Sequence, residues 1–140
     1  MNPFPKLLEG CLIDTKHVES AAIFVAKTGE VTAASNFTVS LLQLCIPTDK
    51  RVCPEQTQTF LDAFKQVNVT RQKGLAFRSK HYTCVRADKH SIYTKCEGHG
   101  LILVRTALYV IVATYSQSMY PSICVEAVEK LAEYLREKGI

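Results

Sequence analysis

Two runs of hydrophobic residues toward the C-terminus are apolar at every position rather than at alternate ones. They are Leu101–Val104 and Leu108–Ala113, and a short segment that begins with Arg105 separates them. A strand that is apolar on both sides needs cover on both faces of its sheet. The pattern therefore predicts a hairpin in the middle of an antiparallel sheet, with helices above and below it.

A helix is predicted to follow this hairpin. Apolar residues recur at helical spacing from Ser122 onward, while most of the glutamates fall on other faces. Pro121 cannot continue the interior of a strand, and Ser122 is the candidate N-cap. The apolar stripe consists of Cys124, Ala127, Val128, Leu131 and Leu135.

The earlier part of the chain alternates between helix and strand patterns. Strand alternation places Tyr82, Cys84 and Arg86 on one face of their strand. The predicted elements are, in chain order, a helix with its stripe at Leu7, Leu8, Cys11 and Leu12, strands over Ser20–Ala26 and Glu30–Ala34, a helix that begins at Pro54 and buries Phe60, Leu61 and Phe64, and strands over Gly74–Arg78, Tyr82–Arg86 and Ser91–Cys96.

This order of elements predicts an α+β fold. We expect an antiparallel sheet of about seven strands, with the N- and C-terminal helices on one face and the middle helix on the other. A length of 140 residues is typical of a single domain, here residues 1–140. The segment Phe37–Val52 fits no element clearly. We interpret it as an exposed loop, and a new partner site is the alternative.

Composition indicates an ordinary globular chain, with 47% hydrophobic and 21% charged residues. No apolar run approaches the roughly 20 residues that span a membrane, and Met1–Lys6 lacks the features of a secretory signal. We therefore expect an intracellular, cytoplasmic protein. Its cysteines should be reduced and mostly buried in the core. They are Cys11, Cys45, Cys53, Cys84, Cys96 and Cys124.

The net charge of +4 is unevenly distributed. The segment Lys65–Lys95 holds eight basic residues against Asp88 alone, a net charge of +7. Because this segment carries the positive field, an anionic partner should meet the protein there.

Six strings of the sequence carry a resemblance to a known family: Asp14–Ala22, Val85–Asp88, Ser91–Tyr93, Val112–Tyr115, Met119–Ala127 and Tyr134–Gly139. They resemble profilins, and in particular a divergent vertebrate branch of that family that is found mainly in testis. The resemblance covers most of the chain, weakens between Phe37 and Val52, and implies a role in spermatogenesis. The resemblance implies a profilin fold and a non-enzymatic cytoskeletal role, with actin monomers, proline-rich peptides and acidic phosphoinositides as the partners to test.

Phospholipid binding needs clustered donors for phosphate, which lysine and arginine supply. A solvated, solubilising face is the alternative explanation of such a cluster. The candidates for binding phosphoinositide or phosphatidate are Arg71, Lys73, Arg78, Lys80, Arg86, Lys89, Lys95 and Arg105.

The proline groove that the resemblance implies is an aromatic trough between the first and last helices, including two tryptophans. This chain has no tryptophan, and Thr32 stands at one of those positions. Only Phe4 and Tyr134 remain as candidate rings. Because polyproline recognition relies on flat rings, we expect it to be weak or lost.

The actin-facing residues that the resemblance implies are Arg86, Lys95, Tyr120 and Pro121. A bulky ring and a rigid proline replace the glycines that ordinary profilins have before the last helix. Actin binding is therefore expected to be weak or absent, and Tyr120 could instead form a different hydrophobic contact.

No motif supports catalysis, a metal site or a cofactor. Cys96 and His99 have metal-ligand spacing, but no second pair completes four ligands. The leading hypothesis is a monomeric, non-enzymatic regulator that binds acidic phospholipids and no nucleic acid. The alternatives are an actin-monomer-binding protein that regulates actin polymerisation, and a small sensory or dimerisation module.

Overall fold

The computed structural model describes residues 4–28, 31–35, 54–77 and 80–140. The predicted loop Phe37–Val52, the candidate Arg78, and Cys45 and Cys53 lie outside this part. The elements are α1 (Phe4–Cys11), η1 (Ile13–Thr15), β1 (Ser20–Val25), β2 (Val31–Ser35), α3 (Pro54–Lys65), α4 (Val67–Lys73), β3 (Leu75–Phe77), β4 (Lys80–Ala87), β5 (Ser91–Cys96), β6 (His99–Arg105), β7 (Tyr109–Tyr115) and α5 (Pro121–Glu137).

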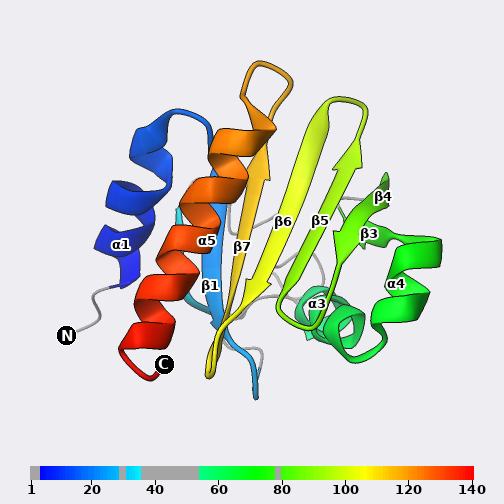
Figure 1. Ribbon diagram of the computed structural model, residues 1–140, viewed down its shortest axis with the longest axis horizontal. Helices are drawn as coiled ribbons and strands as arrows, with labels where there is room; N and C mark the ends of the chain where they lie inside the picture. Colours follow the sequence, from blue (N-terminus) through cyan, green and yellow to red (C-terminus); the bar gives the residue numbers. More distant parts are fainter. Residues whose placement is uncertain (1–3, 29–30, 36–53, 78–79) are drawn as a thin grey trace.

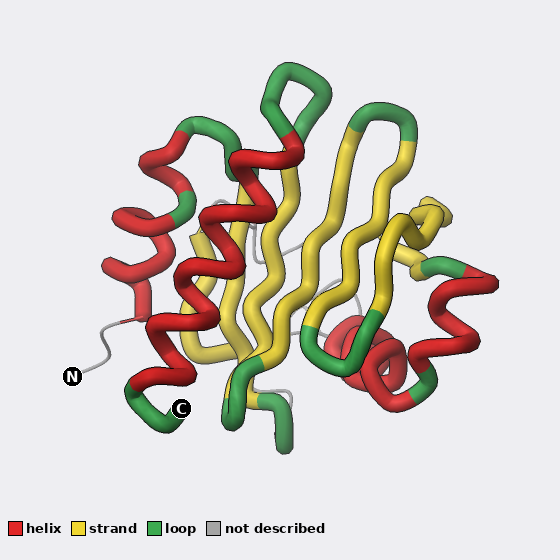
Figure 2. The backbone as a smooth tube through the Cα atoms, viewed as in Figure 1, coloured by secondary structure: helices red, strands yellow, loops and turns green. Residues whose placement is uncertain are grey.

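The strands form one antiparallel sheet of seven, in the order β2-β1-β7-β6-β5-β4-β3. Helices α1 and α5 lie side by side on one face, and α3 lies on the other (Figures 1 and 2). This arrangement confirms the predicted fold class. The β6–β7 hairpin occupies the middle of the sheet, where the continuous apolar runs placed it.

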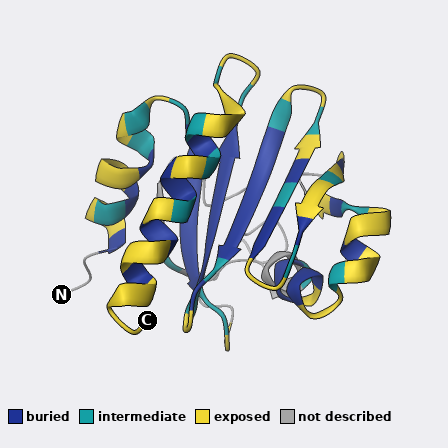
Figure 3. Cartoon of the chain, in the orientation of Figure 1, coloured by how far each residue is buried: buried dark blue, intermediate teal, exposed yellow. Residues whose placement is uncertain are grey.

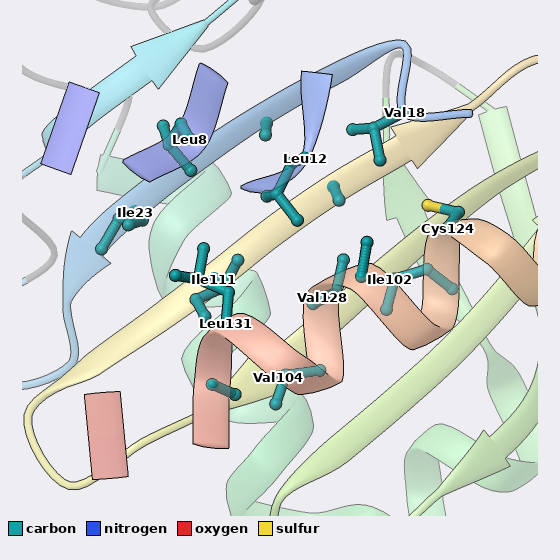
Figure 4. Packing of buried hydrophobic residues seen from close by; sticks show 14 of the residues in the cluster. Leu8, Leu12, Val18, Ile23, Ile102, Val104, Ile111, Cys124, Val128 and Leu131 are labelled. Carbon is teal, nitrogen blue, oxygen red and sulfur yellow. The ribbon is translucent and has the colours of Figure 1, made fainter. Parts of the chain in front are cut away.

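The two faces of the β6–β7 hairpin supply two separate cores, which explains why its strands are apolar at every position. Ile102 and Ile111 pack against α1 and α5, whereas Leu103 and Val112 pack toward α3. Burial is concentrated in β1, β6 and β7 and on the inward sides of the covering helices (Figure 3). Leu8 lies in the core between the sheet and helices α1 and α5, close to β1 (Figure 4).

Local chemistry changes two details of the prediction. Helix α5 has Pro121 at its first position with Tyr120 as N-cap, so Ser122 lies inside the helix and does not cap it. Cys11 is exposed at the end of α1, because Leu8 in the helix and Leu12 just after it take the inward positions. Among the other described cysteines, Cys124 is buried in the core under α1 and α5, and Cys84 and Cys96 are half-buried against the core under α3.

A helix that sequence reasoning did not assign, α4, packs against β4, the strand next to the edge strand β3. It ends at Gly74, whose φ of +71° lies in the left-handed region that favours glycine. A Cβ added to Gly74 would lie 2.1 Å from the carbonyl oxygen of Tyr82. Glycine therefore allows α4 to approach β4 closely and places its basic residues at the edge of the sheet.

A β-bulge in β4 contradicts the predicted alternation. The pairing with β5 joins Cys84 to Thr94 and Arg86 to Tyr93, so the register shifts between Cys84 and Arg86. An extra residue in one strand reverses the face of every side chain beyond it. Arg86 consequently lies on the face of α5, opposite Cys84.

Among the described helices, none is both long and apolar enough to cross a membrane.

Candidate functional site

Three cations from three different elements meet at one end of the sheet. Lys89 lies in the turn after β4, Arg105 ends β6, and Arg136 lies in the last turn of α5. We call this the strand-end pocket; its volume is about 500 Å³, and it is lined by Lys89, His90, Arg105, Thr106, Ala107 and Arg136.

Hydrogen bonds hold the walls of the strand-end pocket together. The Arg105 N–H donates to the His90 carbonyl oxygen at 2.7 Å, which joins the β4–β5 turn to β6. The Arg136 Nη2 donates to the Arg105 carbonyl oxygen at 2.8 Å, which ties α5 to the same strand. Arg136 and His90 were not among the predicted ligands, because the sequence separates Arg136 from the basic segment. The one feature of the sequence that could have indicated Arg136 is its place as a basic residue in the last turn of the predicted C-terminal helix.

A second cationic pocket, the bulge pocket, surrounds the irregular part of β4. Its volume is about 570 Å³, and it is lined by Arg71, Cys84, Val85, Arg86, Ala87 and Asp88. Arg71 donates from Nε and Nη2 to the Ala87 carbonyl oxygen at 2.9 and 2.6 Å. Arg86 forms an ion pair with Asp88 at 3.3 Å and lies over the Tyr93 ring, 5.7 Å from its centroid. Both arginines therefore already have partners within the protein.

The carboxylate of Asp88 is also committed to local contacts. Its Oδ1 accepts the backbone N–H groups of His90 and Ser91, each at 2.8 Å. Burial acts to raise the pKa of Asp88, but these donors and the Arg86 guanidinium outweigh it and hold the pKa below its ordinary value. The anion thus shapes the β4–β5 turn that carries Lys89.

The remaining predicted phospholipid ligands lie elsewhere. Lys80 begins β4 and Lys95 lies near the end of β5, at the opposite end of the sheet from Lys89. At roughly 3.3 Å per residue, Lys95 lies about 13 Å along β5 from Ser91. Lys73 ends α4 at the outer edge. The structure brings Lys89 and Arg105 together and Arg71 and Arg86 together, and it separates these pairs from Lys80 and Lys95.

Helices α1 and α5 enclose an apolar groove of about 550 Å³. Its lining includes Leu7, Ile123, Ala127, Leu131 and Tyr134. The ring of Tyr134 is 43% exposed. At the rim, Lys130 forms an exposed ion pair with Glu126 at 3.1 Å.

Phe4, the other candidate ring for proline peptides, does not line this groove. It is only 6% exposed and packs on Tyr109 at a ring-centroid distance of 4.8 Å. Phe4 lies four residues before Leu8 and therefore on the same face of α1, which points toward the sheet. Of the two predicted rings, the groove therefore contains Tyr134 alone.

Tyr120 has a larger exposed fraction than the other exposed aromatic residue of the described part, Tyr134: 64% against 43%. It stacks on His17 with ring centroids 5.1 Å apart, and its backbone N–H donates to His17 Nδ1 at 3.0 Å. Pro121, which follows it, is also exposed. The chain leaves β7 at Tyr115, at the end of the sheet that carries Lys95, and Tyr120 follows in the connection to α5.

Comparison with known proteins decides the family. The family model named Profilin matches residues 2–140. The chain belongs to the profilin family. It is 45% identical to mouse (Mus musculus) Profilin-4 over 141 residues, which cover 99% of each chain. Acanthamoeba castellanii profilin IA has a similar structure, with a TM-score of 0.81 at 31% identity, over 98% of this chain and 99% of that one.

A second structural relative is a mouse profilin IIa solved in complex with a double repeat from the FH1 domain of mDia1. Its TM-score is 0.65, with 94% of this chain and 95% of that chain covered. At 17% identity this likeness shows the shared fold alone.

Profilins are not enzymes, which confirms the non-enzymatic interpretation of the sequence. Cys84 is not activated as a nucleophile. Burial raises the pKa of its thiol despite the opposing effects of the Arg71 charge and the Arg86 N–H. A raised pKa keeps the thiol protonated, whereas a nucleophile needs the thiolate. Within the described ranges, no group of three or more His, Cys, Asp or Glu side chains is placed to hold a metal ion.

Proposed function

We propose that this profilin is a cytoplasmic regulator of the cytoskeleton that binds acidic phospholipids through its basic surface, with weak or absent binding of actin and of polyproline. The observation that carries the proposal is a set of exposed cations that form no ion pair with another described residue. Within the ranges that the structure covers, Lys73, Lys80, Lys89 and Lys95 form no ion pair. Their charges remain available to an anionic surface.

The size of the effect follows from the number of charges engaged. Each basic residue near an anionic membrane contributes about 1 kcal/mol, so four would contribute roughly 4 kcal/mol, or about a thousandfold in partitioning. Such attachment is reversible and weakens as salt screens the charges.

The weak polyproline binding that we propose rests on the helix groove. A polyproline helix has no internal hydrogen bonds and is recognised by stacking on flat rings and by donors to its carbonyl groups. The groove offers Tyr134, while Phe4 belongs to the core. The resemblance places Thr32 where other profilins have a tryptophan. A single ring provides little stacking area.

A second candidate function is the binding of actin monomers. The exposed ring of Tyr120 favours it, because aromatic side chains are common anchors of protein interfaces. Arg86 and Lys95 lie on the same face of the sheet as α5, which begins next to Tyr120. No observation on the described residues favours the third candidate, a sensory or dimerisation module.

Co-sedimentation with vesicles separates these functions. We expect the protein to pellet with phosphatidylcholine vesicles that contain phosphatidate, to remain in solution with phosphatidylcholine alone, and to dissociate as salt is raised. Equal pelleting with both vesicles, or no pelleting with either, would contradict the proposal. Slowed actin polymerisation in a parallel pyrene-actin assay, without vesicle binding, would favour the second candidate.

A further inference from the structure

We propose that the contact between His17 and Tyr120 is an acid-sensitive switch at the start of α5. The neutral imidazole of His17 holds the backbone of Tyr120 against the segment that joins η1 to β1, and the protonated imidazole releases it. This inference goes beyond the proposed function, because it does not depend on phospholipid binding.

The hydrogen bond between the two residues requires one particular form of the imidazole. The backbone N–H of Tyr120 donates to His17 Nδ1 at 3.0 Å. A backbone N–H can only donate, so Nδ1 must offer a lone pair and the ring proton must lie on Nε2. In the imidazolium form both ring nitrogens carry protons, and two donors would face each other at this distance. Protonation of His17 therefore breaks the bond.

Local hydrogen bonds present His17 to Tyr120. The His17 N–H donates to Thr15 Oγ1 at 3.1 Å, and the Thr15 hydroxyl donates to the Leu12 carbonyl oxygen at 2.7 Å. Lys16, between Thr15 and His17, has a φ of +69° and turns the chain in the left-handed region. The rings of His17 and Tyr120 are stacked, with an interplanar angle of 9°. A defined turn thus fixes the imidazole beside the helix.

The switch acts on the first turn of α5. Tyr120 is the N-cap of this helix, and its side chain makes no capping hydrogen bond. The Tyr120 carbonyl oxygen accepts the N–H groups of Ile123 and Cys124 at 3.1 and 3.2 Å, so its backbone begins the helical bonds. A helix N-terminus carries partial positive charge, which disfavours a cation beside it. An imidazolium at His17 would meet this charge as well as a second donor.

Few charged groups surround the His17–Tyr120 contact. The connection from β7 to α5 carries no charged side chain, and the first one in α5 is Glu126. The segment around His17 contributes Asp14, Lys16 and Glu19. The Glu19 carboxylate lies 3.4 Å from a hydroxyl of β7, which donates to it. Within the part of the chain that the structure describes, His17 forms no ion pair that would compensate for the lost bond.

The aromatic stack does not remove the effect of protonation. An imidazolium is attracted to the face of the Tyr120 ring. It can keep this attraction only by turning Nδ1 away from the Tyr120 N–H, because the two protons repel each other. The backbone N–H of Tyr120 loses its acceptor in either case.

The switch changes the surface that the exposed ring of Tyr120 offers to a partner. In the neutral form the ring is held by the stack and its backbone by the hydrogen bond. After protonation, a partner that anchors on the ring must first order the connection between β7 and α5. We expect this ordering to weaken such an anchor about fivefold.

Hydrogen exchange of the Tyr120 amide, measured by NMR on ¹⁵N-labelled protein, tests the switch. We expect its protection, corrected for the intrinsic effect of pH, to fall about fivefold between about pH 8 and pH 5, the range in which histidine changes charge. The amide of Val128, in the middle of α5, should keep its protection. The ¹⁵N shifts of the His17 ring give a second measurement, and they should show Nδ1 without a proton at neutral pH.

Substitutions at His17 separate the hydrogen bond from other effects of acid. In His17→Asn the amide oxygen accepts the Tyr120 N–H in place of Nδ1 and does not titrate, so protection should persist in acid. In His17→Ala it should be low at both pH values. His90→Asn is the matched control, since His90 is an exposed histidine of the β4–β5 turn, and this variant should behave like the wild type. Circular dichroism shows whether each variant is folded.

Three results would overturn the switch. The Tyr120 amide could keep its protection in acid, the amide of Val128 could lose protection to the same extent, or His17→Asn could lose protection in acid as the wild type does. A proton on Nδ1 of His17 at neutral pH would also contradict the proposed geometry. None of these results bears on vesicle binding, so the switch and the proposed function stand or fail separately.

Discussion

Replacing Tyr93 by phenylalanine removes one hydroxyl group that links β5 to α5. This hydroxyl donates to the carboxylate of Glu129, which also accepts the Ser91 hydroxyl at 2.8 Å. A hydrogen bond to a charged group contributes about 1.5–3 kcal/mol. Because Tyr93 and Glu129 are half-buried, we expect Tyr93→Phe to lower the free energy of unfolding at neutral pH by about 1.5 kcal/mol.

The same hydroxyl gives the protein an alkaline pH dependence. Burial, together with the hydrogen bond and charge of Glu129, raises the pKa of Tyr93 to about 12. An unfolded tyrosine titrates at about pH 10, so the contribution of Tyr93 to stability is complete below that pH and is lost as the pH rises toward 12. The separation of about two pH units corresponds to ~2.7 kcal/mol, which solvent screening at a half-exposed site reduces to about 1 kcal/mol.

Urea denaturation followed by circular dichroism, at neutral pH and through an alkaline series, measures both effects. Tyr134→Phe is the matched control, since its ring is exposed and contacts Lys138. A double-mutant cycle with Glu129→Gln isolates the pair. The reasoning is refuted if Tyr93→Phe unfolds like the control at neutral pH, if the coupling energy is near zero, or if the alkaline loss of stability is the same with and without the hydroxyl.

Three further predictions concern packing and accessibility. Leu8→Ala should lower the free energy of unfolding by about 2–5 kcal/mol in urea denaturation, because Leu8 is completely buried, and a loss below ~1 kcal/mol would contradict this. Gly100→Ala should lower the melting temperature, since its Cβ would lie 1.9 Å from the Tyr115 ring; an unchanged temperature would show that the ring moves freely. Cys11 is exposed and should react with iodoacetamide well before the buried Cys124, whose pKa burial raises to about 12. Peptide mass spectrometry measures the order of labelling, and earlier labelling of Cys124 would contradict the prediction.

Hydrophobic periodicity was sufficient for the fold because burial on two faces leaves a direct mark on a strand. The runs Leu101–Val104 and Leu108–Ala113 became the central hairpin β6–β7, and the stripe after Ser122 became the inward side of α5. The positions Phe60, Leu61 and Phe64 likewise became the buried side of α3. In each case the residue pattern reflects contact with an element that lies next to it in the sheet or across one layer.

The positions of the polar residues needed the tertiary structure. One extra residue in β4 moved Arg86 to the face of α5, and a glycine at positive φ allowed α4 to lie against the sheet edge. Such features depend on single backbone angles, which leave little trace in a pattern of apolar and polar residues.

The sequence alone therefore determined the α+β architecture, the resemblance to profilins and the positive charge of the middle segment. Only the tertiary structure decided how that charge is divided, and it joined Arg136 to Lys89 and Arg105 in one pocket. The physical reason is that hydrophobic burial acts on every residue of an element and repeats with its period. A binding pocket instead depends on the chance of a few side chains from distant elements meeting at one place.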